Sequence, residues 1–307
     1  MANTELRNDA RDGVVSALIA YSLWGLLPIY FKWVGEVAPL EVLAHRIVWA
    51  VPFGALIVHY RHQWPEVRRA LTHRPMLLLL ATAAFFIAAN WFVYIVAVQQ
   101  EQVFQASLGY YINPLAYVLV GVVFLGEKLR ALQVAAVVLA AIGVLVLTFS
   151  GGQFPAISLF LAMSFTIYGV IRKRVVIGGM PGLFVETTLL FPFAVVSLWV
   201  LVDSGQAAFS PANPGLAGLL LLAGPVTVVP LLFFALAARR LNLSTVGFLQ
   251  FLAPTLMFLV GLYHGEQLTT PHLVCFGCIW VAVILYSADA LRATVSKSAQ
   301  TRTAEGK

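Results

Sequence analysis

The sequence predicts an all-α integral membrane protein with ten transmembrane helices, arranged as two inverted halves of five helices each. Composition is the first observation: of 307 residues, 61% are hydrophobic and 10% are charged, and the mean hydropathy is +0.89. Soluble domains carry about 25% charged residues. This composition excludes a soluble enzyme, a disordered protein and a nucleic-acid-binding protein. Two cysteines exclude a disulfide scaffold.

Apolar runs of spanning length are the second observation, because a helix needs about 20 apolar residues to cross a hydrocarbon core about 30 Å thick. Ten segments qualify, at about residues 13–34, 40–60, 76–99, 103–125, 131–150, 155–172, 181–203, 214–238, 243–263 and 271–290. The segments between them are short and carry charge, Pro or Gly, so any chemistry must lie inside the helix bundle. Residues 1–12 precede no cleavage site and form a retained tail. Residues 291–307 form a basic polar tail.

The Lys and Arg residues set the orientation. All of them except Lys32 and Arg46 fall in the two tails or in alternate loops. Positively charged loops stay on the cytoplasmic side, so both termini are expected in the cytoplasm. The net charge of +6 therefore reflects topology and predicts no nucleic-acid partner.

An internal repeat is the third observation. Ser107–Pro114 is followed by Gly126-Glu127, and Ser244–Pro254 is followed by Gly265-Glu266 in the second half. Trp24-Gly25 likewise parallels Tyr168-Gly169. The alternative is a chance alignment of two apolar sequences, which the shared order of landmarks disfavours. Each half, 13–150 and 151–290, has an odd number of spans, so the second half enters from the opposite side. Inverted repeats are typical of transporters.

The most specific prediction concerns two charged residues that lie deep within predicted spans. A charge at the bilayer centre costs about 2.5–3.5 kcal/mol on insertion scales, so it needs a partner, a cavity or a function. Arg46 lies about one and a half turns into the second span, and Glu186 lies equally deep in the seventh. Aligning Pro52-Phe53 with Pro192-Phe193 places the two charges in register, Arg46 at the outer mouth and Glu186 at the inner one. We expect each to belong to one gate or to contact substrate in one state.

Less specific roles remain open for these groups. Arg46 could instead snorkel outward or pair with Glu41, and Glu186 could reach headgroups or the basic cluster at Arg172. His45 is either a proton-coupling group or a buried neutral side chain. Lys32 near the outer end of the first span is either a gate residue or a snorkelling lysine.

Aromatic and amide side chains predict the lining of a cavity. Trp24 lies near the middle of its span, away from the interface that tryptophan prefers. Proline frees the carbonyl four residues before it, and freed backbone at membrane depth marks gates and binding sites in transporters. Interhelical hydrogen bonding is the alternative role for the Asn and Gln residues. The predicted substrate-binding residues are Trp24, Arg46, Asn90, Trp91, Tyr94, Tyr110, Asn113, Tyr168 and Gln250; the predicted proton-coupling or gate residues are His45, Glu186 and Lys32.

Several of these segments also carry a family resemblance. Glu41–Arg46, Asn90-Trp91, Ala106–Pro114, Tyr168–Lys173 and Pro254–Phe258 resemble the RarD proteins of the EamA group in the drug/metabolite transporter superfamily. The resemblance covers about residues 13–290. It implies two EamA repeats, cytoplasmic termini and a bacterial inner-membrane permease for a metabolite or drug. It also implies proton coupling or facilitated exchange.

The predicted function is secondary active or facilitative transport of a small organic solute, an amino-acid-like metabolite or an amphipathic drug, by alternating access. We expect no cofactor, no metal and no catalytic residue, and a monomer or homodimer in the lipid bilayer. Cys275 and Cys278 have CxxC spacing but no second pair. No HExxH, GxSxG or P-loop motif is present, so an enzyme is not expected. The alternatives are a non-transporting membrane sensor or assembly protein and, less favoured, a membrane-embedded enzyme.

Overall fold

A computed structural model describes residues 2–125, 130–151, 154–238, 240–241, 246 and 249–305, and the regular structure in these ranges is helical. The repeat landmarks at Gly126–Leu129 and Ser244-Thr245 lie outside the described residues. The helices are α1 (Ala2–Trp33), α2 (Pro39–Tyr60), α3 (Trp64–Thr72), α4 (Arg74–Gln99), α5 (Val103–Leu125), α6 (Ala131–Gly151), α7 (Ala156–Arg174), α8 (Gly179–Asp203), α9 (Pro214–Ala238), α11 (Leu252–Tyr263) and α12 (Thr270–Glu305).

Eight helices within the described residues are long and apolar enough to cross a membrane. They lie within α1, α2, α4, α6, α7, α8, α9 and α12. The fourth predicted span coincides with α5, whereas the ninth is a described continuous helix only from Leu252. Pro254 lies in the first turn of α11, where its missing N–H costs no hydrogen bond. The total of ten spans and the inverted relation of the halves stay predictions.

Helix α3 is an element that the sequence analysis assigned to a loop. It begins with Trp64-Pro65, and proline is preorganised for a first helical turn. Val67 and Ala70 are buried on one face, while Arg68 and Arg69 are exposed. This spacing gives a short amphipathic helix that packs against α8 and α4.

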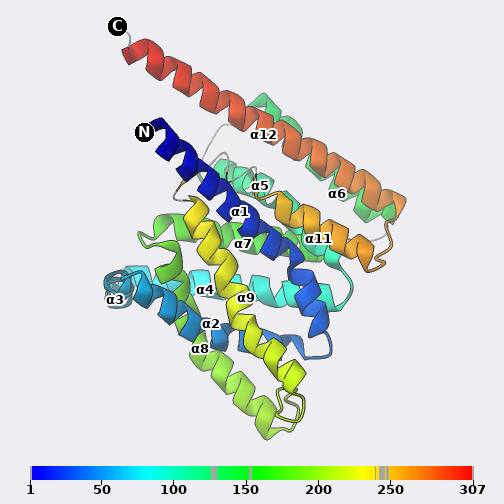
Figure 1. The fold of residues 1–307 in the computed structure, drawn as a ribbon. Coiled ribbons are helices and arrows are strands. Elements are labelled where there is room, and N and C mark those ends of the chain that lie inside the picture. The colour runs from blue at the N-terminus through cyan, green and yellow to red at the C-terminus, as the bar shows by residue number, and fades with distance from the viewer. Residues whose placement is uncertain are drawn as a thin grey trace.

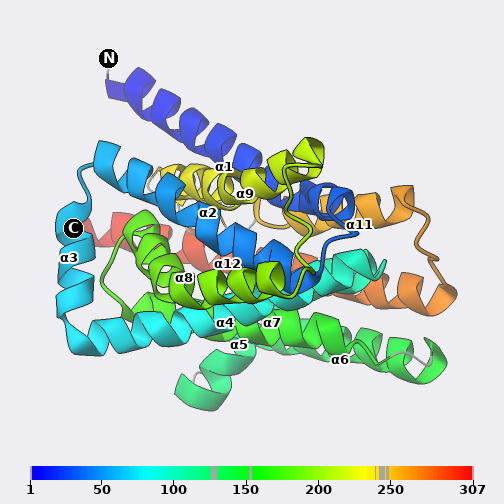
Figure 2. The ribbon, with the colours of Figure 1, turned by 90° about the horizontal axis from the view of Figure 1, so that it is seen from below.

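The two halves interlock. The most extensive helix contacts join an element before residue 151 to one after it: α6 with α12, α2 with α8 and α9, α1 with α9 and α11, and α7 with α4 and α5. Figure 1 shows the α6–α12 pair side by side, away from α2 and α8, and in Figure 2, seen from below, α2 and α8 lie in front of α12. Gly143 allows the close approach of this pair, because an added β-carbon would lie 2.9 Å from Cβ of Cys278. Cys275 is buried in the same interface.

Glutamate carboxylates accept hydrogen bonds from backbone amides of loops and helix starts at both ends of the bundle. At the end that carries α3, which we call the α3 end, Glu66 accepts a hydrogen bond from the Gly178 amide at 2.8 Å. At the opposite end, Glu41 accepts from the Ala208 and Phe209 amides in the α8–α9 loop. Glu266 accepts from the first two amides of α5 there, at 2.5 and 2.8 Å. Burial raises the pKa of Glu266, although these amides act to lower it.

Candidate functional site

Arg46 is a buried cation in the interior of the bundle, seven residues into α2. Its side chain is 5% exposed, and its Nε donates a hydrogen bond to Thr227 Oγ1 of α9 at 2.8 Å. The guanidinium carbon lies 4.2 Å from the ring centroid of Trp91 and 5.6 Å from that of Phe31. These distances are those of cation–π contacts. Nη1 has no hydrogen-bond partner among the described residues.

No carboxylate balances this charge within the described part of the chain. Its described contacts are the Thr227 hydroxyl and the rings of Trp91 and Phe31, the nearby phenols of the tyrosines are neutral, and no described ion pair includes it. Glu41, the partner that the sequence offered, binds loop amides instead. Removing a charge from water costs several kcal/mol unless a partner compensates. The ring faces, at about 0.5–2 kcal/mol each, offset only part of this cost.

Asn90 connects the surroundings of Arg46 to α7. Its amide nitrogen donates to the Leu161 carbonyl and to Ser164 Oγ, at 3.0 and 2.9 Å. Its oxygen accepts a hydrogen bond from the Tyr110 hydroxyl at 3.2 Å. The hydroxyl of Tyr94 is buried without a partner among the described residues. We call Phe31, Arg46, Trp91, Tyr94, Tyr110 and Thr227 the Arg46 site.

A line of aromatic rings runs from the Arg46 site toward the α3 end. The successive centroid distances are 5.7 Å for Phe31–Tyr94, 5.8 Å for Tyr94–Tyr110, 6.0 Å for Tyr110–Phe165 and 5.9 Å for Phe165–Tyr168. Three of these contacts are edge-to-face, the arrangement that aromatic quadrupoles favour. The line ends at another buried charge of the bundle.

That charge is Glu186, which is fully buried seven residues into α8. One carboxylate oxygen lies 3.5 Å from Arg172 Nε, and the other accepts a hydrogen bond from the Tyr168 hydroxyl at 3.2 Å. Arg172 also donates to the Gly178 carbonyl at 3.3 Å. A β-carbon on Gly182 would overlap the Arg172 guanidinium, so the glycine makes room for the pair. We call Tyr168, Arg172, Gly182 and Glu186 the Glu186 site.

Two predicted gate residues lie at the opposite end of the bundle. His45 Nδ1 accepts from Trp49 Nε1 at 3.1 Å, and its ring lies 5.0 Å from that of Phe209. Its Nε2 is 3.9 Å from Glu41, so His45 faces the α8–α9 loop. Lys32 is half-buried in the last turn of α1 and acts electrostatically on Glu266.

The remaining predicted residues are dispersed. The ring centroid of Trp24 lies 5.7 Å from that of Tyr21 and 5.6 Å from that of Phe234, and Trp24 also packs against the core that includes Trp91. Asn113 is buried before Pro114 of α5, and its oxygen has no partner in the described residues. Gln250 is half-buried in the turn that precedes α11.

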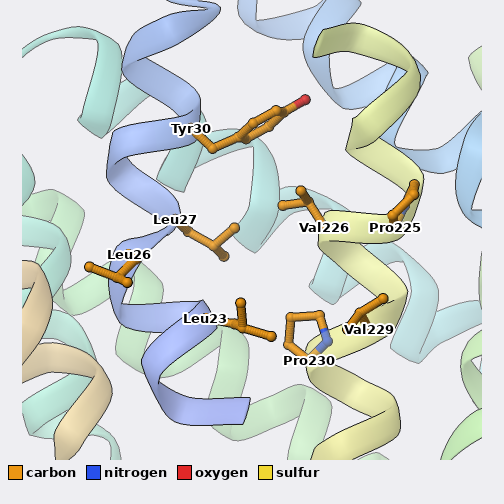
Figure 3. Close-up of a pocket in the computed structure, with 8 residues that line it drawn as sticks. All are labelled: Leu23, Leu26, Leu27, Tyr30, Pro225, Val226, Val229 and Pro230. Atoms are coloured by element: carbon orange, nitrogen blue, oxygen red, sulfur yellow. The ribbon is translucent and has the colours of Figure 1, made fainter. Parts of the chain in front are cut away.

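An apolar cleft lies beside the Arg46 site, between α1 and α9 (Figure 3). Its volume is about 290 Å³. Leu23 and Leu27 of α1 face Val226 and Pro230 of α9, and Tyr30 closes one end with its hydroxyl directed toward α9. That hydroxyl donates to the Leu219 carbonyl at 2.9 Å. We call this the α1–α9 cleft. A second apolar cleft of about 570 Å³ lies between α2, α4 and α8.

Sequence reasoning missed Thr227, Phe31 and Gly182 as parts of these two sites. A signal was present for Thr227, the one hydroxyl between Pro225 and Pro230. Nothing local identified Phe31 or Gly182, because their roles depend on which helix packs against them.

Known proteins resemble this chain over most of its length. Residues 11–149 match the EamA-like transporter family. A protein of Vibrio cholerae serotype O1, described as an uncharacterized transporter, is 42% identical over 295 residues, which is 95% of this chain and 97% of its own. Protein RarD of Salmonella typhi is 42% identical, with 92% and 96% covered. Protein RarD of Escherichia coli K12 is 40% identical, with 92% and 95% covered.

A solved structure also matches. It is described only as the crystal structure of a protein, and it superposes with a TM-score of 0.58 at 18% identity, covering 89% of this chain and 96% of its own. This likeness shows a shared fold alone.

Proposed function

This chain belongs to the RarD family of EamA-like membrane transporters, in the drug/metabolite transporter superfamily, and we propose on that premise that it moves a small organic solute across a bacterial inner membrane by alternating access. The observation that carries the proposal is the Arg46 site. It holds a buried cation with an open hydrogen-bonding edge where helices of both halves meet. A buried charge that nothing in the described fold balances favours a ligand as its partner.

The packing of the two halves supports alternating access. The contacts of α1 with α9 and α11 have counterparts in those of α7 with α4 and α5. Helix pairs that correspond in this way are what an inverted repeat requires, and exchanging their conformations exchanges the side that is open. In our proposal the two termini face the cytoplasm, and the α3 end is therefore the cytoplasmic end.

The Glu186 site is the proposed gate at that end. Its ion pair and the Tyr168 hydrogen bond join α7 to α8 while the gate is closed. Glu186 is also the proposed proton carrier, because the line of rings places it in sequence with the Arg46 site. His45 and Lys32 lie at the opposite end, and we assign them to the outer turns and not to the solute path.

Counterflow tests this function directly. Proteoliposomes preloaded with a mixed pool of amino acids and related metabolites receive labelled solutes one at a time. We expect uptake of at least one solute by the wild type, and none by Arg46→Ala. Arg174→Gln removes an exposed positive charge and is the matched control. If folded and inserted protein takes up no solute, the result supports a membrane sensor and contradicts transport.

A further inference from the structure

We propose that the solute is an amphipathic monocarboxylate: its carboxylate binds the open edge of Arg46 and its apolar body lies in the α1–α9 cleft. The inference deepens the proposed transport function and rests on it. Binding, however, can be measured without any flux.

Charge complementarity gives the first argument. The planar guanidinium matches a carboxylate in a two-point arrangement, and Nη1 is the buried donor that the described fold leaves open. Thr227 holds Nε, and Trp91 lies against the guanidinium, so the group is already oriented before a ligand arrives. Besides Nη1, the site has a second buried polar group without a described partner, which is the hydroxyl of Tyr94.

The number of charges favours a carboxylate over a phosphate. A phosphate monoester carries about −1.5 to −2 charges at pH 7 and needs more than one cation. The described contacts of the Arg46 guanidinium are a threonine hydroxyl and two ring faces, and no second cation of the described chain is among them. His45, the adjacent residue, is directed toward Trp49 and Glu41. One positive charge balances one carboxylate.

The position of the cleft gives the second argument. Its lining is apolar apart from the Tyr30 hydroxyl, and Tyr30 also acts on Arg46. One turn of α9 carries both Val226, which lines the cleft, and Thr227, which binds Arg46. Apolar and charge-binding surfaces therefore meet on that turn, as an amphipathic ligand requires.

Helix α9 is also the part of this wall that can yield. Pro225 and Pro230 remove the helical hydrogen bonds to the carbonyls of Leu221 and Val226. The segment between the cleft and Arg46 is thus weakened on both sides of Thr227. A small displacement there would join the cleft to the cation.

The binding test uses three probes of one shape: 4-phenylbutyrate, 4-phenylbutyramide and 4-phenylbutylamine. We measure the thermal unfolding midpoint of the purified full-length protein in detergent at equal probe concentrations. Only the carboxylate is expected to raise the midpoint, because a ligand stabilises the state that it binds. Arg46→Gln should abolish the rise, Arg46→Lys should weaken apparent affinity about tenfold, and Arg174→Gln should leave it unchanged.

A second variant tests the cleft. Val229→Phe fills it from α9, and Val138→Phe adds the same ring to an exposed face of α6 as the control. The cleft variant should weaken 4-phenylbutyrate binding about tenfold. Acetate, which has the carboxylate without the apolar body, is added as a fourth probe, and its response should be the same in the variant and the wild type. The α6 variant should change neither response.

Three results would overturn the inference: an equal response to the amide or amine, a response that survives Arg46→Gln, or no response to 4-phenylbutyrate. Its failure is separable from that of transport. Carboxylate binding without counterflow contradicts transport alone. Counterflow of a neutral solute that does not depend on Arg46 contradicts the carboxylate alone.

Discussion

The Arg46 and Glu186 sites place opposite charges at the same depth, seven residues past Pro39 in one helix and past Gly179 in the other. Their surroundings differ. Glu186 has an arginine and a phenol as partners, whereas Arg46 has one threonine hydroxyl and two ring faces. A paired charge joins helices, and an unpaired one leaves a position for a ligand. The role of a buried charge therefore depends on its partners and does not follow from its position along the helix alone.

The largest expected effect comes from Arg46→Met. Methionine keeps an unbranched apolar stem and removes the guanidinium with its charge, so transport should fall at least about 100-fold with the loss of a charge-assisted hydrogen bond of about 3 kcal/mol. The free energy of unfolding should be unchanged or about 1 kcal/mol higher, because replacing an uncompensated buried charge by an apolar group removes a cost. Counterflow and chemical unfolding in mixed micelles measure the two effects. A large loss of stability would show that Arg46 is a structural residue.

Glu186→Leu should have the opposite effect on stability. Removal of the carboxylate leaves Arg172 without its ion-pair partner at the edge of the bundle. The free energy of unfolding should fall by about 3 kcal/mol, the lower range for a broken buried pair. Unfolding in the same micelles measures it, with the exposed Asp203→Asn as control. Stability equal to that of the wild type would remove the distinction between the two sites.

Gly182→Ala tests the ion pair without touching either charge. The added methyl group must displace the Arg172 guanidinium, so the free energy of unfolding should fall by about 1–2 kcal/mol. In an Arg172→Ala background the same methyl group should cost almost nothing. A double-mutant cycle measures this coupling. Additive costs would mean that the methyl group clashes elsewhere.

The smallest effect separates two tyrosines. Tyr168→Phe removes a hydrogen bond to Glu186 and should lower the free energy of unfolding by about 1 kcal/mol. Tyr94→Phe removes a buried hydroxyl that has no described partner and should leave stability equal or slightly higher. Parallel unfolding curves compare them, and equal losses would contradict the assignment of Tyr94 to a ligand.

Local patterns predicted most of the described helices, but not α3, and placed both charges about two turns into theirs. Between the first and last turns of α2, the apolar run is interrupted only at His45 and Arg46, and the cost of inserting a charge identifies Arg46 as unusual. The partner of Glu186 was one of two alternatives, because Arg172 follows a span that ends near the start of α8.

Contacts between residues far apart in the sequence could not be predicted from local patterns. Arg46 and Thr227 are 181 residues apart, and only the rotation of α9 about its axis brings them together. The repeat predicted that Trp24 and Tyr168 line a cavity; both pack against the core that includes Trp91, and Trp24 also contacts Tyr21 and Phe234. Side-chain direction depends on helix rotation, which a periodic apolar pattern fixes poorly when the helix is apolar on all sides.

The interlocked halves have a consequence for biogenesis. A nascent chain that has been synthesised only as far as α6 has made Arg46, but Thr227 and the faces of α8, α9 and α12 do not yet exist. Its main helix partners are still to be translated. The contacts within the first half are fewer, so we expect its helices to reach their final packing only after the second half has been inserted.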